Sequence, residues 1–172
     1  EVDGVRIGNN SSFGNMTGLD TRSISVADIE SVEVITGVPS AEYGDLNSGM
    51  VKIHTKKGKT PWNVLLSINP RTEQVSFSKG LDLGNDKGIV NISGEWIKAT
   101  QKLNSPYTSY TRRGFSAGYS NTFRKVLRFD IGLTGNIGGM NTKDDPDAYT
   151  GEYTKVRDYV FRANTSLAWL LN

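Results

Sequence analysis

From Trp62 onward, apolar and polar residues alternate along the chain in successive short runs. A period of two is typical of β-strands with one apolar face, because successive side chains of a strand point to opposite sides of the sheet. Such alternation predicts a mainly β structure in which consecutive strands form an antiparallel meander, without long helices. The runs are Trp62–Ile68, Val75–Ser78, Val90–Trp96, Phe115–Ser120, Leu127–Asn136 and Tyr159–Leu171.

The lengths of the runs and of their connections narrow the choice of β fold. With flanking residues the runs are about ten residues long, which suits a tilted strand that crosses a bilayer. The connections after the second and fourth runs, near 81–86 and 123–125, are short, whereas those after the third and fifth, 98–111 and 138–154, are long. Short turns on one side and long loops on the other are expected of a transmembrane β-barrel. The connection after the first run, near 69–71, is short and adds nothing to the argument.

The tryptophans support the same interpretation. Trp62 and Trp169 would lie at one rim of the strands and Trp96 at the other, as aromatic girdles do at the two membrane interfaces. A soluble, secreted β-sandwich that serves as an adhesin or binding module also has alternating strands and is the alternative. In a sandwich, the cleanest apolar run would face a closed core: Leu127, Phe129, Ile131 and Leu133.

Composition excludes several other classes of protein. The 172 residues have a net charge of +2 without a basic stripe, so nucleic acid is not an expected partner. The absence of cysteine removes disulfides, cysteine nucleophiles and cysteine-ligated zinc. No apolar run reaches the length of a membrane-spanning helix. We expect neither a cofactor nor a metal.

Ahead of the alternating runs, two further strand-like stretches, Val32–Thr36 and Met50–Thr55, flank a glycine-rich turn. One or two helical turns are predicted to lead into the first of them, with Ser25 as the N-cap. Charge, glycine and proline together mark a boundary near 56–61.

This segment reads IESVEVITGVP at 29–39 and, after a turn that contains Tyr43 and Gly44, GMVKIHTK at 49–56. The order is similar to a known pattern: an I-E-x-I-E-V-x-x-G-P strand, a small-residue turn with Y-G, and a G-G-V-I-N-I-x-T-K strand. Asp3–Ile7 further upstream is similar to a D-G-V-R/P-L strand. Two departures are Val38, which is inserted before Pro39, and Met50, which replaces the second glycine of the last strand. With this order the segment resembles the end of the plug domain of TonB-dependent outer-membrane transporters. The matching residues are Ile29, Glu30, Val32, Glu33, Val34, Gly37, Tyr43, Gly44, Gly49, Val51, Ile53, Thr55 and Lys56.

The resemblance implies transport and not catalysis. Residues 1–59 would be the C-terminal half of a mixed α/β plug domain, and residues 60–172 the N-terminal strands of an outer-membrane β-barrel of about 22 strands. A small nutrient ligand would bind on the extracellular side, and TonB, acting through a segment outside this chain, would remodel the plug to admit it. The implied location is the outer membrane of a Gram-negative bacterium, in contact with its lipid. By analogy with some members a surface lipoprotein is a further partner, although no residue here argues for one.

The Gly- and Asn-rich loop Gly8–Leu19 is the candidate apex of the plug, where ligand would be touched. Its amides would supply hydrogen bonds and its aromatic ring a stacking face. A loop that binds no ligand is the alternative. The candidate ligand-binding residues are Asn9, Asn10, Phe13, Asn15 and Tyr43.

Three other patterns have structural explanations that we prefer to catalytic or metal-binding ones. Residues 114–118 fit the G-x-S-x-G nucleophile elbow, but Ser116 lies inside an alternating run and no histidine follows it. The single histidine, His54, has no second histidine to share a metal with. An acidic loop has carboxylates for calcium, yet a solvated loop is the simpler interpretation. Its acids are Asp144, Asp145, Asp147 and Glu152.

Charged residues of the plug-like segment allow two interpretations. Arg22, Glu30, Glu33 and Lys52 are either docking contacts with a polar barrel wall or ordinary solvated charges of a small domain.

Overall fold

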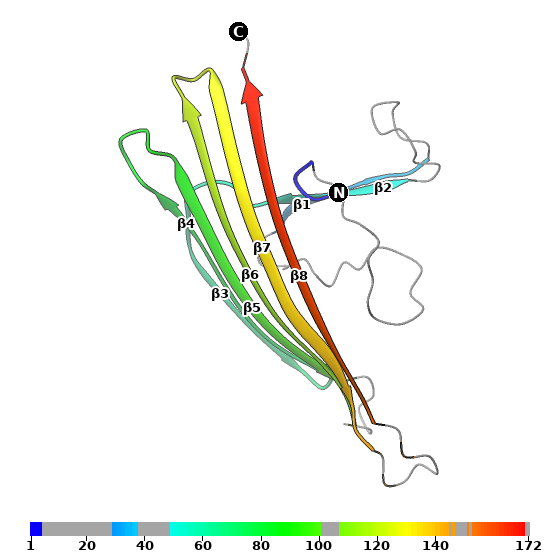
Figure 1. Cartoon of the computed structure of the whole chain (residues 1–172). Helices are drawn as coiled ribbons and strands as arrows, with labels where there is room; N and C mark the ends of the chain where they lie inside the picture. The colour runs from blue at the N-terminus through cyan, green and yellow to red at the C-terminus, as the bar shows by residue number, and fades with distance from the viewer. Residues whose placement is uncertain are drawn as a thin grey trace. The chain divides into compact units, whose positions relative to one another are not determined.

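The computed structural model describes residues 1–4, 29–37, 49–100, 107–144, 146, 151 and 153–170 (Figure 1). The chain forms two compact units, Glu1–Thr21 with Asp28–Lys56, and Arg22–Ala27 with Lys57–Asn172. All regular elements in the described ranges are strands, so the mainly β prediction is confirmed there.

None of the described residues belongs to a helix long and apolar enough to cross a membrane.

In the first unit, β1 (Ile29–Ile35) pairs antiparallel with β2 (Met50–Thr55), with Val32 opposite Ile53. The two predicted strands are therefore confirmed. The prediction of helical turns directly before Val32 was wrong for residues 29–31, because these residues form ladder hydrogen bonds with β2 across a register shift. Pairing with a neighbouring strand overrides a local capping signal. The rest of the predicted helical segment, with Ser25, lies outside the described residues.

On its other side, β2 is held by the first residues of the chain. Val2 forms a parallel bridge with Ile53, and the Asp3 amide donates to the Ile53 carbonyl over 3.0 Å. The Asp3 carboxylate accepts hydrogen bonds from both the amide and the hydroxyl of Thr55, over 3.0 and 2.5 Å. At the start of β2, Gly49 allows close approach, since an added Cβ would lie 2.2 Å from the Ile35 carbonyl oxygen.

The second unit holds one six-stranded antiparallel sheet in the order β3-β4-β5-β6-β7-β8, so the predicted meander is confirmed. Figure 1 shows these strands side by side in one curved layer. The sheet does not close, because β3 and β8 are its two edges. The strands are β3 (Thr60–Asn69), β4 (Thr72–Asp82), β5 (Ile89–Thr100), β6 (Thr108–Phe123), β7 (Leu127–Thr142) and β8 (Thr154–Trp169).

The last three strands have 16 residues each, longer than the sequence predicted. Polar residues beyond each apolar run continue the ladder, because backbone pairing does not depend on side-chain polarity. The two long connections shrink accordingly, to 101–107 and 143–153. They still lie at the same end of the sheet, together with the tight turn at 70–71, whereas 83–88 and 124–126 lie at the other end. We call these the loop end and the turn end.

The register from β4 to β8 has no shift, whereas β3 has a bulge between Thr60 and Asn63. One row therefore runs straight across the sheet, from Ser78 through Ser93, Ser116 and Thr134 to Arg162. Paired residues on neighbouring strands point to the same face of the sheet. The alternation of apolar and polar residues therefore stays in step across all five strands.

The β6–β7 turn has an unusual pair of central residues. Arg124 and Lys125 have φ values of 51° and 61°, and the Val126 amide donates to the Phe123 carbonyl over 3.0 Å. Positive φ at both central residues is what a type I′ hairpin turn requires, and Asn-Gly is its preferred sequence. The β4–β5 turn meets the same requirement with Asn85 and Asp86, which tolerate positive φ better.

Replacing the central pair by Arg124→Asn together with Lys125→Gly should raise the free energy of unfolding by about 1 kcal/mol, because neither new residue is strained at positive φ. Equilibrium denaturation of the purified protein measures the change. The control is Asp86→Gly in the other turn, where a smaller gain is expected. A lower stability of the double variant would contradict the proposed strain.

Candidate functional site

The regular register gives the six-stranded sheet two chemically different faces. We call the first the apolar face and the second, on the opposite side, the polar face. The apolar face includes Trp62, Val64, Leu66, Ile68, Val75, Phe77, Ile92, Trp96, Phe115, Ala117, Leu127, Phe129, Ile131, Leu133, Ile137, Tyr159, Phe161, Leu167 and Trp169.

Burial on this sheet is inverted relative to a water-soluble domain. Val64, Leu133 and Phe161 are 69%, 50% and 66% exposed on the apolar face. Among the described residues the only buried hydrophobic side chains, Met50 and Ile53, belong to β2 in the other unit. Polar side chains are buried instead, and most of them lie on the polar face: Ser76, Ser78, Ser93, Glu95, Arg112, Asp130 and Asn136.

A buried ion pair joins three strands on the polar face. The Arg112 guanidinium of β6 donates to the Glu95 carboxylate of β5, and the side chains are 6% and 0% exposed. Gln74 of β4 donates to the other oxygen of Glu95 over 3.2 Å. Within the described part of the chain, Arg112 Nε and the Ser76 hydroxyl are buried and lack a hydrogen-bond partner. This cluster is a desolvated polar centre that cross-links neighbouring strands.

Further hydrogen bonds cross the polar face toward the turn end. The hydroxyls of Ser93 and Ser116 are 2.9 Å apart, and Ser120 donates to Asp130 over 2.6 Å. Arg128 also donates to Asp130, over 3.0 Å. Several side chains of the polar face therefore satisfy one another's hydrogen bonds.

Aromatic side chains mark both ends of the apolar face. Trp62 and Trp169 lie at the turn end and Trp96 at the loop end, as the sequence predicted for two rims. Lys79 Nζ lies 5.8 Å from the centre of the Trp62 ring, which is a cation–π distance.

In the middle of the apolar face, Gly135 lies in register between Phe115 and Phe161. The two rings are tilted, with centroids 6.2 Å apart, and an added Cβ at Gly135 would lie 2.3 Å from the Phe115 ring. The two rings thus cover Gly135, which has no side chain of its own to pack against its neighbours.

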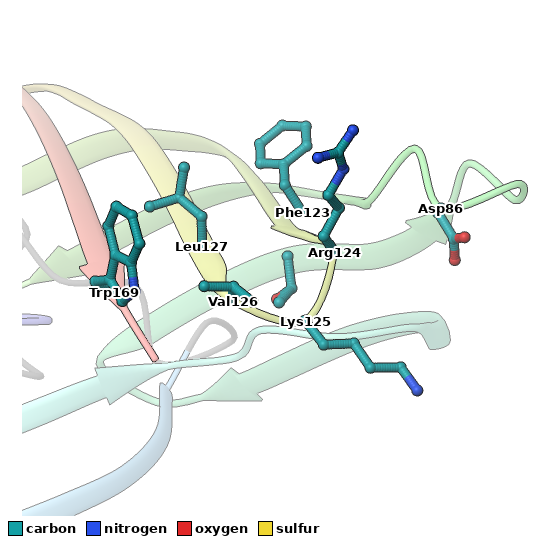
Figure 2. A pocket seen from close by; sticks show the side chains of 8 residues that line it. Asp86, Phe123, Arg124, Lys125, Val126, Leu127 and Trp169 are labelled. Atoms are coloured by element: carbon teal, nitrogen blue, oxygen red, sulfur yellow. The ribbon is translucent and has the colours of Figure 1, made fainter. Parts of the chain in front are cut away.

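At the turn end, a shallow hollow of about 840 Å³ surrounds the β6–β7 turn (Figure 2). Figure 2 shows the Phe123 and Arg124 side chains next to each other, Leu127 and Trp169 further from them, and Lys125 pointing away from Arg124. Asp86 stands apart on the β4–β5 turn. The charged groups do not converge on a common point, so this hollow offers no acid–base pair for catalysis.

The structure tests only some of the residues singled out in the sequence. The candidate ligand-binding residues Asn9, Asn10, Phe13, Asn15 and Tyr43 all lie outside the described residues, as does Arg22.

The motif residues that are described occupy strands. Ser116 lies inside β6, so the strand–turn–helix geometry of a nucleophile elbow is not formed there. His54 is exposed on β2, and Glu33 lies opposite Lys52 in the β1–β2 register. In the ranges that the structure describes, no group of three potential metal ligands comes together. Of the acidic loop, Asp144 is described, and Asp145, Asp147 and Glu152 are not.

Sequence reasoning missed the pair of Glu95 and Arg112. Glu95 is a charged residue at a polar position of the run Val90–Trp96, whereas Arg112 precedes the run Phe115–Ser120 and carries no pattern signal. Many charged residues share the signal of Glu95, and only the register of β5 with β6 shows which two meet.

Comparison with known proteins bears on the first unit. Residues 1–51 match the TonB-dependent Receptor Plug Domain. The resemblance seen in the sequence is thereby confirmed for this plug-domain segment, which includes β1 and the start of β2. The matching family is one of transport receptors and not of enzymes. Neither the curated proteins nor the solved structures contain a match to this chain.

Removing one partner of the buried pair, by Arg112→Met or Glu95→Gln, should lower the free energy of unfolding by about 3 kcal/mol, since the other partner loses its counter-charge. The double variant should be closer to the parent than the sum of the single variants. Denaturant unfolding of all four proteins measures the coupling.

The matched control is the pair of Lys98 and Glu73, which also joins adjacent strands but is 3.9 Å long and about half exposed. Its coupling should be below about 1 kcal/mol. Equal coupling in the two pairs would contradict a desolvated centre at Glu95.

Proposed function

We propose that this chain is part of a TonB-dependent outer-membrane transporter, in which residues 1–59 are the end of the plug and residues 60–172 are barrel strands. The observation that carries the proposal is the inverted burial of the six-stranded sheet, with a continuous exposed apolar face and a buried polar one. The plug-domain match of residues 1–51 supports it independently.

The apolar face has the dimensions of a membrane-spanning band. From Leu127 to Ile137 on β7, one side of the strand is apolar or glycine. At about 3.3 Å per residue and a tilt near 45°, this stretch rises roughly 23 Å, close to the apolar band of about 25 Å on outer-membrane barrels. Transfer of each exposed apolar side chain from water into lipid would stabilise the protein by roughly 1.5–3 kcal/mol.

The polar face would then line the interior of the barrel. Its networks around Glu95 and Asp130 would present hydrogen-bonding groups to water or to the plug. Shorter connections at the turn end favour the periplasm for that end, and the loop end would then be extracellular. Further strands would pair with β3 and β8, whose edges are open in the described sheet.

The proposed activity is ligand binding followed by gated passage. Ligand would meet the plug loop Gly8–Leu19 from outside, and TonB would act on a segment beyond this chain. Outer-membrane lipid is a partner of the apolar face. The runner-up is the soluble β-sandwich, which requires a second sheet over Leu133 and its neighbours. Those side chains are exposed in the described structure, which favours lipid as their environment.

A carboxylate placed on the apolar face should block membrane assembly, whereas the same group on the polar face should not. Leu133→Asp should destabilise the membrane-inserted protein by roughly 1–2 kcal/mol more than Thr134→Asp. Thr134 lies opposite Arg162, so the aspartate introduced at position 134 would have a cationic partner. Heat-modifiable mobility and the amount recovered in outer membranes measure the difference.

Fluorescence quenching by brominated lipids distinguishes a membrane-embedded sheet from a soluble β-sandwich. They should quench the tryptophan fluorescence of the protein in nanodiscs, because Trp62 and Trp169 are 60% and 69% exposed on the apolar face. A protein that is soluble without detergent and unquenched would refute the proposal.

Transport itself predicts a nutrient whose uptake needs both this protein and TonB. In the host, a panel of labelled glycans, peptides, metal chelates and vitamins should include one whose uptake falls on deletion of either gene. Asn9→Ala with Asn15→Ala should reduce that uptake while leaving the amount of protein in the outer membrane unchanged. Uptake that persists without TonB would rule out this mechanism.

A further inference from the structure

The hollow around the β6–β7 turn lies at the end of the apolar band. The last row of the apolar face holds Phe123, Leu127 and Trp169, and the turn at 124–126 follows this row. Two apolar side chains remain exposed there: Val126 is 40% exposed, and Leu170, whose amide donates to the Val126 carbonyl over 2.7 Å, is 45% exposed. Exposed apolar groups beside charged ones mark surfaces that bind another molecule.

Both faces of the sheet contribute to the hollow. Thr122 belongs to the polar face, opposite Arg128, and Phe123 belongs to the apolar face, opposite Leu127. Thr122 and Phe123 both line the hollow. A molecule that fills the hollow therefore lies across the end of the sheet. Bilayer lipid would cover the apolar face alone, so the hollow is better suited to a ligand that approaches from the water beyond the turn.

The charge around the hollow is positive. Arg124 and Lys125 line it and are exposed, and Lys87 on the β4–β5 turn is exposed as well. Asp86 is the one acid among the described lining residues, and it stands apart from the β6–β7 turn in Figure 2. Arg124 and Lys125 point away from each other (Figure 2), so they would contact two separate anionic groups of an extended ligand.

The two cations of the turn occupy backbone positions that do not favour them. With φ values of 51° and 61°, Arg124 and Lys125 stand where Asn-Gly is the preferred sequence. Backbone strain of this kind is commonest at functional sites, where the side chains that it presents are needed. The turn thus keeps two charges at its tip at a cost in stability, which a role in binding would account for.

We propose that the hollow binds an extended acidic segment of a periplasmic protein. Carboxylates of that segment would contact Arg124 and Lys125, and an apolar side chain would lie against Phe123 and Val126. Guanidinium groups bind carboxylates with paired, charge-assisted hydrogen bonds, and complementary charge directs a partner to the site. This inference rests on the proposed function, which places the turn end in the periplasm.

The test uses the protein at its natural length in nanodiscs of zwitterionic lipid, titrated with a fluorescent peptide that is rich in glutamate and carries a single phenylalanine. Fluorescence anisotropy should show about tenfold tighter binding of this peptide than of the same peptide with glutamine in place of glutamate. Added salt should reduce this preference, because the contacts at the turn are exposed.

Two variants of the turn test the role of the cations. Arg124→Gln with Lys125→Gln should abolish the preference for the acidic peptide. Arg124→Asn with Lys125→Gly should abolish it as well, although this variant is expected to be more stable than the parent, so that loss of binding cannot be a loss of fold. The control is Arg113→Gln with Arg157→Gln, which removes the same charge from exposed residues at the loop end and should keep the preference.

Equal binding of the two peptides, a preference that survives in the turn variants, or its loss in the control would show the inference to be wrong. It is also wrong if anionic phosphatidylglycerol in the nanodiscs displaces the peptide by binding to Arg124 and Lys125, because the site would then serve lipid. Quenching by brominated lipid is measured on the same samples. Quenching without a peptide preference rejects the docking site alone, whereas absent quenching rejects the proposed function.

Discussion

The unshifted antiparallel pairing from β4 to β8 is the constraint on which the rest of this structure depends. Because paired residues point to the same face of the sheet, each strand adds its apolar side chains to one continuous surface and its polar side chains to the other. A shift of one residue in any ladder would place Ile131 and Leu133 among the serines of the polar face. Pairing thus turns six separate amphipathic strands into one two-sided sheet.

Such a sheet is stable only where its apolar face meets apolar surroundings and its polar face meets water or other hydrogen-bonding groups. Exposed side chains such as Val64, Phe161 and Trp169 gain nothing in water, and a bilayer supplies the apolar surroundings that a second protein layer supplies in a sandwich. Under the proposed function, lipid around the apolar face would take the place of a hydrophobic core. A lipid environment would account for the buried side chains of the described sheet being polar, among them Glu95 and Arg112.

The plug-domain segment is a small unit in which β2 is bound on both sides, by β1 and by the residues around Asp3. In the described part of this unit, Met50 and Ile53 are the buried hydrophobic side chains. The Asp3 backbone and carboxylate thus tie the first residues of the chain to both Ile53 and Thr55 of β2.

The alternation from Trp62 to Trp169 was enough to predict six strands, their meander order and the two aromatic rims. A repeat of two residues is a local property of the sequence and needs no knowledge of distant contacts. The plug resemblance was likewise readable, since Ile29–Lys56 keep a recognisable order. Strand ends were misjudged, because polar stretches such as Thr108–Arg113 pair through their backbones without a side-chain signal. Only the tertiary structure decided that Arg112 meets Glu95 and that Phe115 and Phe161 cover Gly135. Those contacts depend on which residues of different strands stand side by side, and register arises from the sheet as a whole.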